Sequence, residues 1–216
     1  MFSFAKDSLK KSAAVRQEHF EAKDYTTAQM MGRLSFWMAV VCLSCLAAVG
    51  NTVISFARDL ALSVEASASL ATTLVGVLAV CNGLGRIITG AVFDAFGRRV
   101  TMIGANLITI LSAGLTLLAV SVHSLPLCIA GLCLTGMSYG ACPTITAAFT
   151  SSFFGMQYFS TNMALMTFTV MGGSLIATVS NKVLELTGGY TATFGMLLGL
   201  TVVALALNIF IRKPYS

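Results

Sequence analysis

Arg86 and Asn82 are the residues whose types and spacing most clearly allow binding chemistry. They lie four positions apart in a long apolar segment, so in a helix they share one face, which Gly90 extends. A planar guanidinium holds a carboxylate through two parallel hydrogen bonds, and a neighbouring amide can orient the guanidinium or contact the ligand. An arginine at the centre of a membrane helix costs about 2.5–3.5 kcal/mol on insertion scales, and such residues usually mark pathways. The stripe therefore predicts an anion-binding cavity.

A structural role is the alternative for Arg86. Asp94 lies eight residues further on, about 12 Å along a helix axis, so the guanidinium could instead pair with that carboxylate or with helix-end carbonyls. Tyr139 is a further candidate for the cavity. Other polar residues in the apolar runs could line it too, although residues of this kind more often bond between helices: Asn51, Thr52, Asn106 and Asn162.

The elements that position these residues must be membrane-spanning helices. The chain has 216 residues, of which 56% are hydrophobic and 10% charged, whereas soluble domains carry about 25% charged residues. One helical crossing needs about 20 apolar residues. Six such runs follow one another, and we expect helices over about 34–56, 67–93, 100–122, 126–149, 159–181 and 190–211. The sequence thus predicts an all-α membrane protein with a six-helix bundle over 33–213 and a charged tail over 1–32.

The basic residues are distributed unequally between the two sides of such a bundle. Arg58 and Lys182 fall on one side, and ten basic residues fall on the other: Lys6, Lys10, Lys11, Arg16, Lys23, Arg33, Arg98, Arg99, Arg212 and Lys213. Because cytoplasmic loops carry an excess of Lys and Arg, we expect both termini in the cytoplasm and the chain in the plasma (inner) membrane. These positions form no basic patch for nucleic acid.

Features inside the runs favour packing and gating over catalysis. Pro143 should kink the fourth helix and free a backbone carbonyl, for gating or as plain structural accommodation. Small-residue pairs should let helices approach closely: Gly136 with Gly140, and Gly195 with Gly199. The six cysteines lie within the runs, without the His or acidic neighbours of a metal site. No Ser/His, paired-Asp or His-rich set lies there either, so we expect neither an enzyme nor a metal or cofactor.

The segment from Gly90 to Arg99, between the second and third runs, is the most specific motif. Gly90 would admit a neighbouring helix, Asp94 would end one helix, and Gly97 would allow a tight turn that Arg98 and Arg99 hold at the cytoplasmic face. The decapeptide resembles the loop signature of the major facilitator superfamily, Gly-x-x-x-Asp-basic-x-Gly-Arg-basic, with Ala95 in place of the first basic residue.

Two further stretches are similar to oxalate/formate antiporter-like members of that family. One is Asp24 to Met31 followed by Phe36-Trp37, and the other is Gly136 to Gly140 leading to Phe153-Phe154-Gly155 and Asn162. The resemblance implies the C-terminal six-helix half of such a transporter, with residues 1–32 as the linker between halves and the Gly90–Arg99 motif as a gating element. It also implies an arginine at the position of Arg86.

On this resemblance we expect a transporter of small organic anions, such as mono- or dicarboxylates, working by alternating access. The partner would be a second six-helix half, as a separate chain or a second copy in a homodimer. No Asp, Glu, Lys or His lies in the first, third, fourth, fifth or sixth run as delimited above, so this half favours exchange or facilitated diffusion. The alternative is a truncated, non-transporting membrane protein or a structural or assembly partner.

Overall fold

The structure is a computed structural model, and it describes residues 24–211. The described part consists of helices and short connections. Residues 1–23 of the tail expected over 1–32 lie outside it, as do the basic residues Arg212 and Lys213, whereas the short helix Thr27–Met31 falls within the described part of that tail. The helices are α2 (Thr27–Met31), α3 (Leu34–Ser63), α4 (Ala68–Ser121), α5 (Leu125–Phe154), α6 (Phe159–Met166), α7 (Phe168–Thr187) and α8 (Tyr190–Phe210).

Helix α4 supplies two crossings because it reverses at Gly97. Its 54 residues would extend about 81 Å if straight, far more than a bilayer core of about 30 Å. Gly97 alone has non-helical angles, with φ at 75° and ψ at 179°, a conformation that glycine adopts readily. The six-residue connection expected over 94–99 is therefore a one-residue break. With α3, α5, the α6–α7 segment and α8, the described residues form six crossings.

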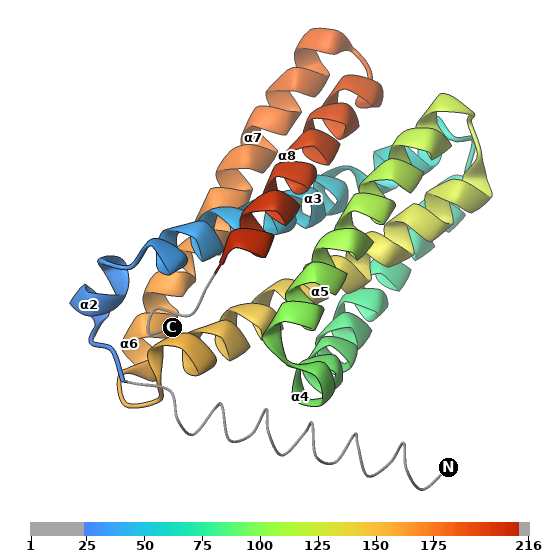
Figure 1. The fold of residues 1–216 in the computed structure, drawn as a ribbon. Coiled ribbons are helices and arrows are strands. Elements are labelled where there is room, and N and C mark those ends of the chain that lie inside the picture. Colours follow the sequence, from blue (N-terminus) through green and yellow to red (C-terminus); the bar gives the residue numbers. More distant parts are fainter. Residues whose placement is uncertain (1–23, 212–216) are drawn as a thin grey trace, which may run out of the picture.

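The connections alternate between the two ends of the bundle (Figure 1). The α2 end holds α2, the Gly97 turn, the 155–158 connection and the last residue of α8, and the far end holds the 64–67, 122–124 and 188–189 connections. The expected fourth helix ended at 149, but α5 continues to Phe154. The expected fifth helix is divided at Thr167 into α6 and α7.

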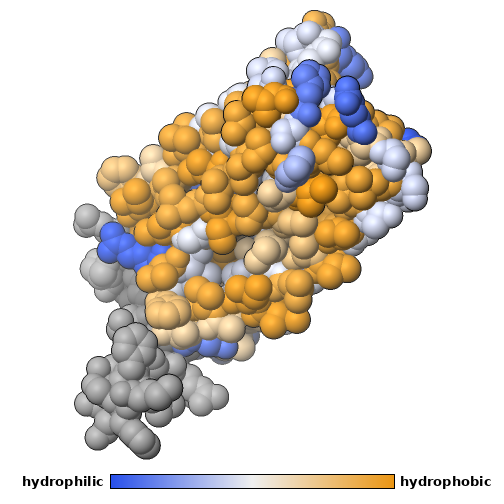
Figure 2. All heavy atoms as spheres, turned by 90° about the vertical axis from the view of Figure 1, so that its right-hand side faces the viewer, coloured by the Kyte–Doolittle hydropathy of each residue, from blue (hydrophilic) through white to orange (hydrophobic). Residues whose placement is uncertain are grey.

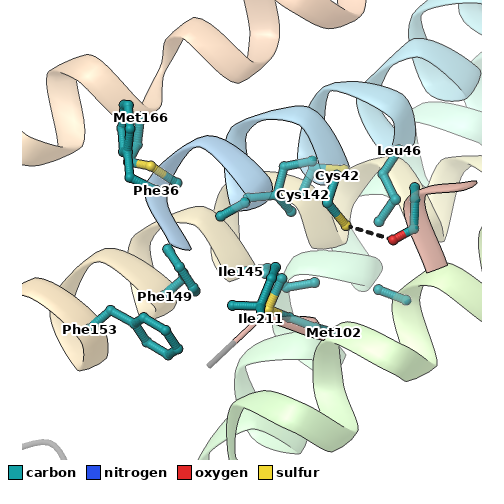
Figure 3. Close-up of a cluster of buried hydrophobic side chains, with 14 of the residues drawn as sticks. Phe36, Cys42, Leu46, Met102, Cys142, Ile145, Phe149, Phe153, Met166 and Ile211 are labelled. Carbon is teal, nitrogen blue, oxygen red and sulfur yellow. Dashed lines mark hydrogen bonds between the residues drawn. The ribbon is translucent and has the colours of Figure 1, made fainter. Parts of the chain in front are cut away.

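The core at the α2 end joins α3, α4, α5 and α8 through side chains that are almost fully buried (Figure 3). Phe149 and Phe153 stack with their ring centroids 4.2 Å apart. The Cys42 thiol donates a hydrogen bond to the carbonyl oxygen of Ala204, with a distance of 3.4 Å. Cys42 therefore acts as a small packing residue that links α3 to α8, and all six cysteines are free thiols.

Close contact between α4 and α5 depends on three glycines. A Cβ on Gly85 would collide with the backbone of Met137, and a Cβ on Gly136 or Gly140 with the backbone at Leu78 or Asn82. The expected close contact at Gly136 and Gly140 is thus present. Within the described residues Gly195 and Gly199 have no neighbouring atom within 4 Å, and a Cβ on Gly90 would be 3.9 Å from Thr144, so none of the three makes such a contact inside this bundle.

The outer surface is mainly apolar. Figure 2 shows one face on which hydrophobic residues cover most of the area and hydrophilic ones gather toward the ends. Large side chains exposed over the middle of the helices include Leu84, Ile87, Leu111, Leu175 and Val203. A surface of this kind suits the hydrocarbon of a bilayer rather than water.

Candidate functional site

Arg86 lies on an exposed face of α4, near the middle of the crossing that precedes Gly97, and Asn82 lies one turn earlier and is half-buried. Neither Arg86 nor Asp94 forms an ion pair within residues 24–211, so the structural alternative of an Arg86–Asp94 pair is not formed. Gly140 packs against the backbone of Asn82. This contact fixes the height of the Asn82–Arg86 stripe relative to α5.

Tyr139 of α5 packs against α3. It is half-buried near the middle of α5, and its ring covers Gly50 of α3, where a Cβ would collide with the ring carbons. The next residue, Gly140, is the one that packs against Asn82, so Tyr139 lies near the Asn82–Arg86 stripe. Pro143 is exposed one turn further along α5. Because proline has no N–H, the carbonyl of Tyr139 lacks its helical donor.

A hydrogen bond between α3 and α7 extends this polar region. The side-chain amide of Asn51 donates to the hydroxyl of Ser174, with a distance of 3.3 Å, and the pair is exposed. Asn51 directly follows Gly50, which Tyr139 covers. The sequence singled out Asn51, whereas Ser174 was missed because a lone serine in an apolar run carries no distinctive signal.

We call these five residues the mid-depth belt: Asn51, Asn82, Arg86, Tyr139 and Ser174. Each lies near the middle of its crossing, and together they connect α4, α5, α3 and α7. An exposed guanidinium and an exposed amide at this depth are costly against lipid tails, so such groups face water or protein. The belt combines one fixed positive charge with neutral hydrogen-bonding groups, which suits a small ligand carrying a carboxylate.

The Gly90–Arg99 motif lies at the α2 end, away from the belt. Arg98 donates to the carbonyl of Ile211 over 3.4 Å, and its guanidinium carbon lies 4.9 Å from the ring centroid of Phe153. It therefore ties the Gly97 turn to the ends of α8 and α5. Asp94 and Arg99 are exposed. Either side chain can therefore bind a new partner without breaking a buried contact.

At the same end, hydrogen bonds join the segment Asp24–Thr27 to three residues at the end of α5 and the start of α6. We call this set the latch, and its other members are Phe154, Gln157 and Asn162. Asp24 accepts from the backbone N–H of Gln157, and the N–H of Tyr25 donates to the carbonyl of Phe154, each over 3.0 Å. The buried Asn162 donates to the carbonyl of Tyr25 and accepts from the hydroxyl of Thr27, again over 3.0 Å each. The Tyr25 ring packs edge-on against Phe154.

Three residues considered for the cavity therefore have other surroundings. Asn162 belongs to the latch. Asn106 is buried and donates to the carbonyl of Met102 within its own helix, and Thr52 is buried as well. Of the two neighbours Asn51 and Thr52, only Asn51 has a hydrogen bond to α7.

The comparisons with known proteins agree with this architecture. A relative in Escherichia coli (strain K12), the uncharacterized MFS-type transporter YhjX, is 29% identical over 149 residues, which cover 67% of this chain and 36% of that protein. The chain thus matches little more than a third of the relative's length. The family model of the Major Facilitator Superfamily matches residues 39–216, which include α3 from its sixth residue onward and all the later crossings. The chain belongs to the major facilitator superfamily.

Proposed function

We propose that this chain is half of a membrane transporter for small organic anions, such as mono- or dicarboxylates. The observation that carries the proposal is the exposed guanidinium of Arg86 at mid-depth, one helical turn from Asn82 and without an ion-pair partner in the described residues. Family membership supports transport rather than enzyme activity. A charge-assisted hydrogen bond contributes about 1.5–3 kcal/mol, enough for a carboxylate to bind and still dissociate.

A second six-helix bundle completes the site in this proposal. Gly76 and Gly83, seven residues apart on α4, have no neighbouring atom within 4 Å, and Arg86 follows on the same side of the helix. A glycine face of this kind lets another helix approach closely. The two halves of this superfamily are parallel repeats related by an axis along the membrane normal. A second copy of this chain or a separate half would therefore enclose the belt.

Transport would then proceed by alternating access, with the two bundles rocking about the belt. We assign the α2 end to the cytoplasm, since Arg33, Arg98 and Arg99 lie there. Asp94 and Arg99, which are exposed, would exchange contacts with the partner as that end opens, while Arg98 and Gly97 hold the turn. Pro143 weakens α5 next to the belt. Exchange of one anion for another fits a belt whose described residues include no Asp, Glu, Lys or His.

Reconstitution into liposomes tests the proposal. The chain is inserted with and without any second half that copurifies, and uptake of labelled formate or oxalate into carboxylate-loaded vesicles is measured. We expect Arg86→Lys to lower the exchange rate about tenfold or more, because Lys keeps the charge but loses the planar two-bond geometry. Asn181→Ala, in α7, should leave the rate near that of the unmodified chain.

If Arg86→Lys and Asn181→Ala lowered the exchange rate equally, Arg86 would not be part of the binding site. Absence of carboxylate exchange in every preparation of the unmodified chain would contradict the transporter and favour a structural or assembly role.

A further inference from the structure

Gly50 of α3 lies under the side chain of a single aromatic residue. A Cβ on Gly50 would lie 2.6 Å from the Cβ of Tyr139 and closer still to two carbons of its ring, Cγ and Cδ2. Gly85 differs, because the three atoms nearest to its Cβ would all be backbone atoms of Met137. Gly85 thus brings two helix backbones together, whereas Gly50 provides a seat for one side chain.

The seat determines the direction of the Tyr139 ring. A side chain in a helix has two accessible χ1 wells. The colliding carbons Cγ and Cβ do not move when the ring turns about χ2, so turning the ring cannot relieve a collision at position 50. Any side chain there must change χ1 of Tyr139 or push α3 and α5 apart. Gly50 is buried and Tyr139 is half-buried, so the ring covers the glycine and keeps one edge at the surface.

The open space next to the ring lies on the side of the Asn82–Arg86 stripe. Gly140, the residue after Tyr139, packs against the backbone of Asn82, so Tyr139 lies between α3 and α4. Pro143, one turn after Tyr139, is exposed, so no helix within residues 24–211 covers this face of α5. A ring that left α3 would extend over this face and reduce the space in front of the stripe.

We propose that Gly50 is a positioning residue that sets the size of the anion that the mid-depth belt admits. The missing side chain lets the Tyr139 ring lie against α3, and this leaves room beside Arg86 for the part of the ligand that is not bound by the guanidinium. The inference rests on the proposed transport function and adds a residue that acts on selectivity through Tyr139. Because interiors are closely packed, a single methyl group at position 50 is enough to displace the ring.

Exchange of two anions of different size tests the proposal. Rates for formate and for the larger succinate are measured in proteoliposomes with the unmodified chain, with Gly50→Ala and with the control Gly131→Ala. Gly131 also meets a neighbouring helix, at Thr116, but it lies in the far-end part of α5, outside the belt. We expect Gly50→Ala to lower the succinate-to-formate ratio about tenfold, as a misfit of one methylene does in a binding pocket. Gly131→Ala should leave the ratio unchanged.

Tyr139→Ala provides a second variant. Without the ring the belt is wider, so the succinate-to-formate ratio should rise. Adding Gly50→Ala to Tyr139→Ala should then leave the ratio nearly unchanged, because no ring remains to be displaced. A Gly50→Ala chain that folds only together with Tyr139→Ala would also support the seat.

Three results would overturn the proposal. The first is an equal loss of formate and succinate exchange in Gly50→Ala. The second is the same fall in the ratio with and without the Tyr139 ring. The third is a Gly50→Ala chain that folds in neither background, because Gly50 would then serve the contact between the helix backbones.

Thiol labelling separates this proposal from the transport function. Arg86→Cys in proteoliposomes is treated with a charged, membrane-impermeant methanethiosulfonate, with Gly50 and with Gly50→Ala, and peptide mass spectrometry separates the label from the six native cysteines. We expect slower labelling with Gly50→Ala, because the displaced ring covers position 86. That result without any carboxylate exchange by the unmodified chain would support the seat and contradict the proposed function. Normal exchange with an unchanged ratio and unchanged labelling would support the function and contradict the seat.

Discussion

At the residue scale, polar groups in this chain have two kinds of surroundings. Those of the latch are buried and satisfied by specific partners, as Asn162 is by Tyr25 and Thr27. Those of the mid-depth belt are exposed or half-buried, and Arg86 has no ion-pair partner in the described region. The buried amide of Asn162 holds two segments together, whereas an exposed polar group is accessible to a ligand. Burial therefore distinguishes Asn162 from Arg86, although both are polar residues in apolar segments.

Asn162→Ala should destabilise the bundle. Removal of the amide takes away its hydrogen bonds with the carbonyl of Tyr25 and the hydroxyl of Thr27, and loss of a buried partner costs roughly 1–3 kcal/mol. We expect a lower midpoint of thermal unfolding in detergent micelles. Asn181→Ala is the control, since the carbonyl oxygen of Asn181 is buried without a hydrogen-bond partner, so its loss should cost little. An unchanged midpoint for Asn162→Ala would show that the latch contributes nothing to stability.

At the element scale, six crossings and a turn at Gly97 could be predicted from apolar run length and from the glycine between two charged positions. Helix ends were less predictable, because α5 extends past its apolar run by packing Phe153 and Phe154 into the core. The latch could not be foreseen from spacing. Its two segments, around Tyr25 and Asn162, are 137 residues apart in sequence. Tyr25 was noticed only through the family resemblance, and Asn162 was considered for the cavity rather than for this contact.

Glycine pairs show the same limit of prediction from sequence. Their spacing alone does not reveal which face of a helix packs against a neighbouring helix. Gly140→Ala should destabilise the fold by about 1–3 kcal/mol, since the added methyl would lie 2.9 Å from the carbonyl carbon of Asn82. Gly199→Ala should instead stabilise α8 by up to about 1 kcal/mol, because its surroundings are open. Denaturant titration of the helical circular dichroism signal measures both. If both variants changed the free energy of unfolding in the same direction, the packing described for α4 and α5 would be contradicted.

At the scale of the whole molecule, the bundle has an apolar surface suited to lipid and a face that carries the exposed residues of the belt. The unfilled glycine face of α4 lies beside the belt, so a second bundle placed there would enclose Arg86 without burying it in hydrocarbon. The tertiary arrangement was needed to recognise the belt, because Ser174 joins it only through its hydrogen bond with Asn51 of α3.

The account depends most on the claim that Arg86 lies in water halfway through the membrane. Reactivity of Arg86→Cys toward an impermeant charged thiol reagent in proteoliposomes measures this directly, with Ile87→Cys as the control because Ile87 is apolar and 72% exposed at the same depth. We predict that the cysteine at 86 reacts at least tenfold faster than the one at 87, and that added carboxylate leaves the control unchanged. Equal, slow reaction at both positions would place Arg86 in lipid or in a dry contact and contradict the anion site.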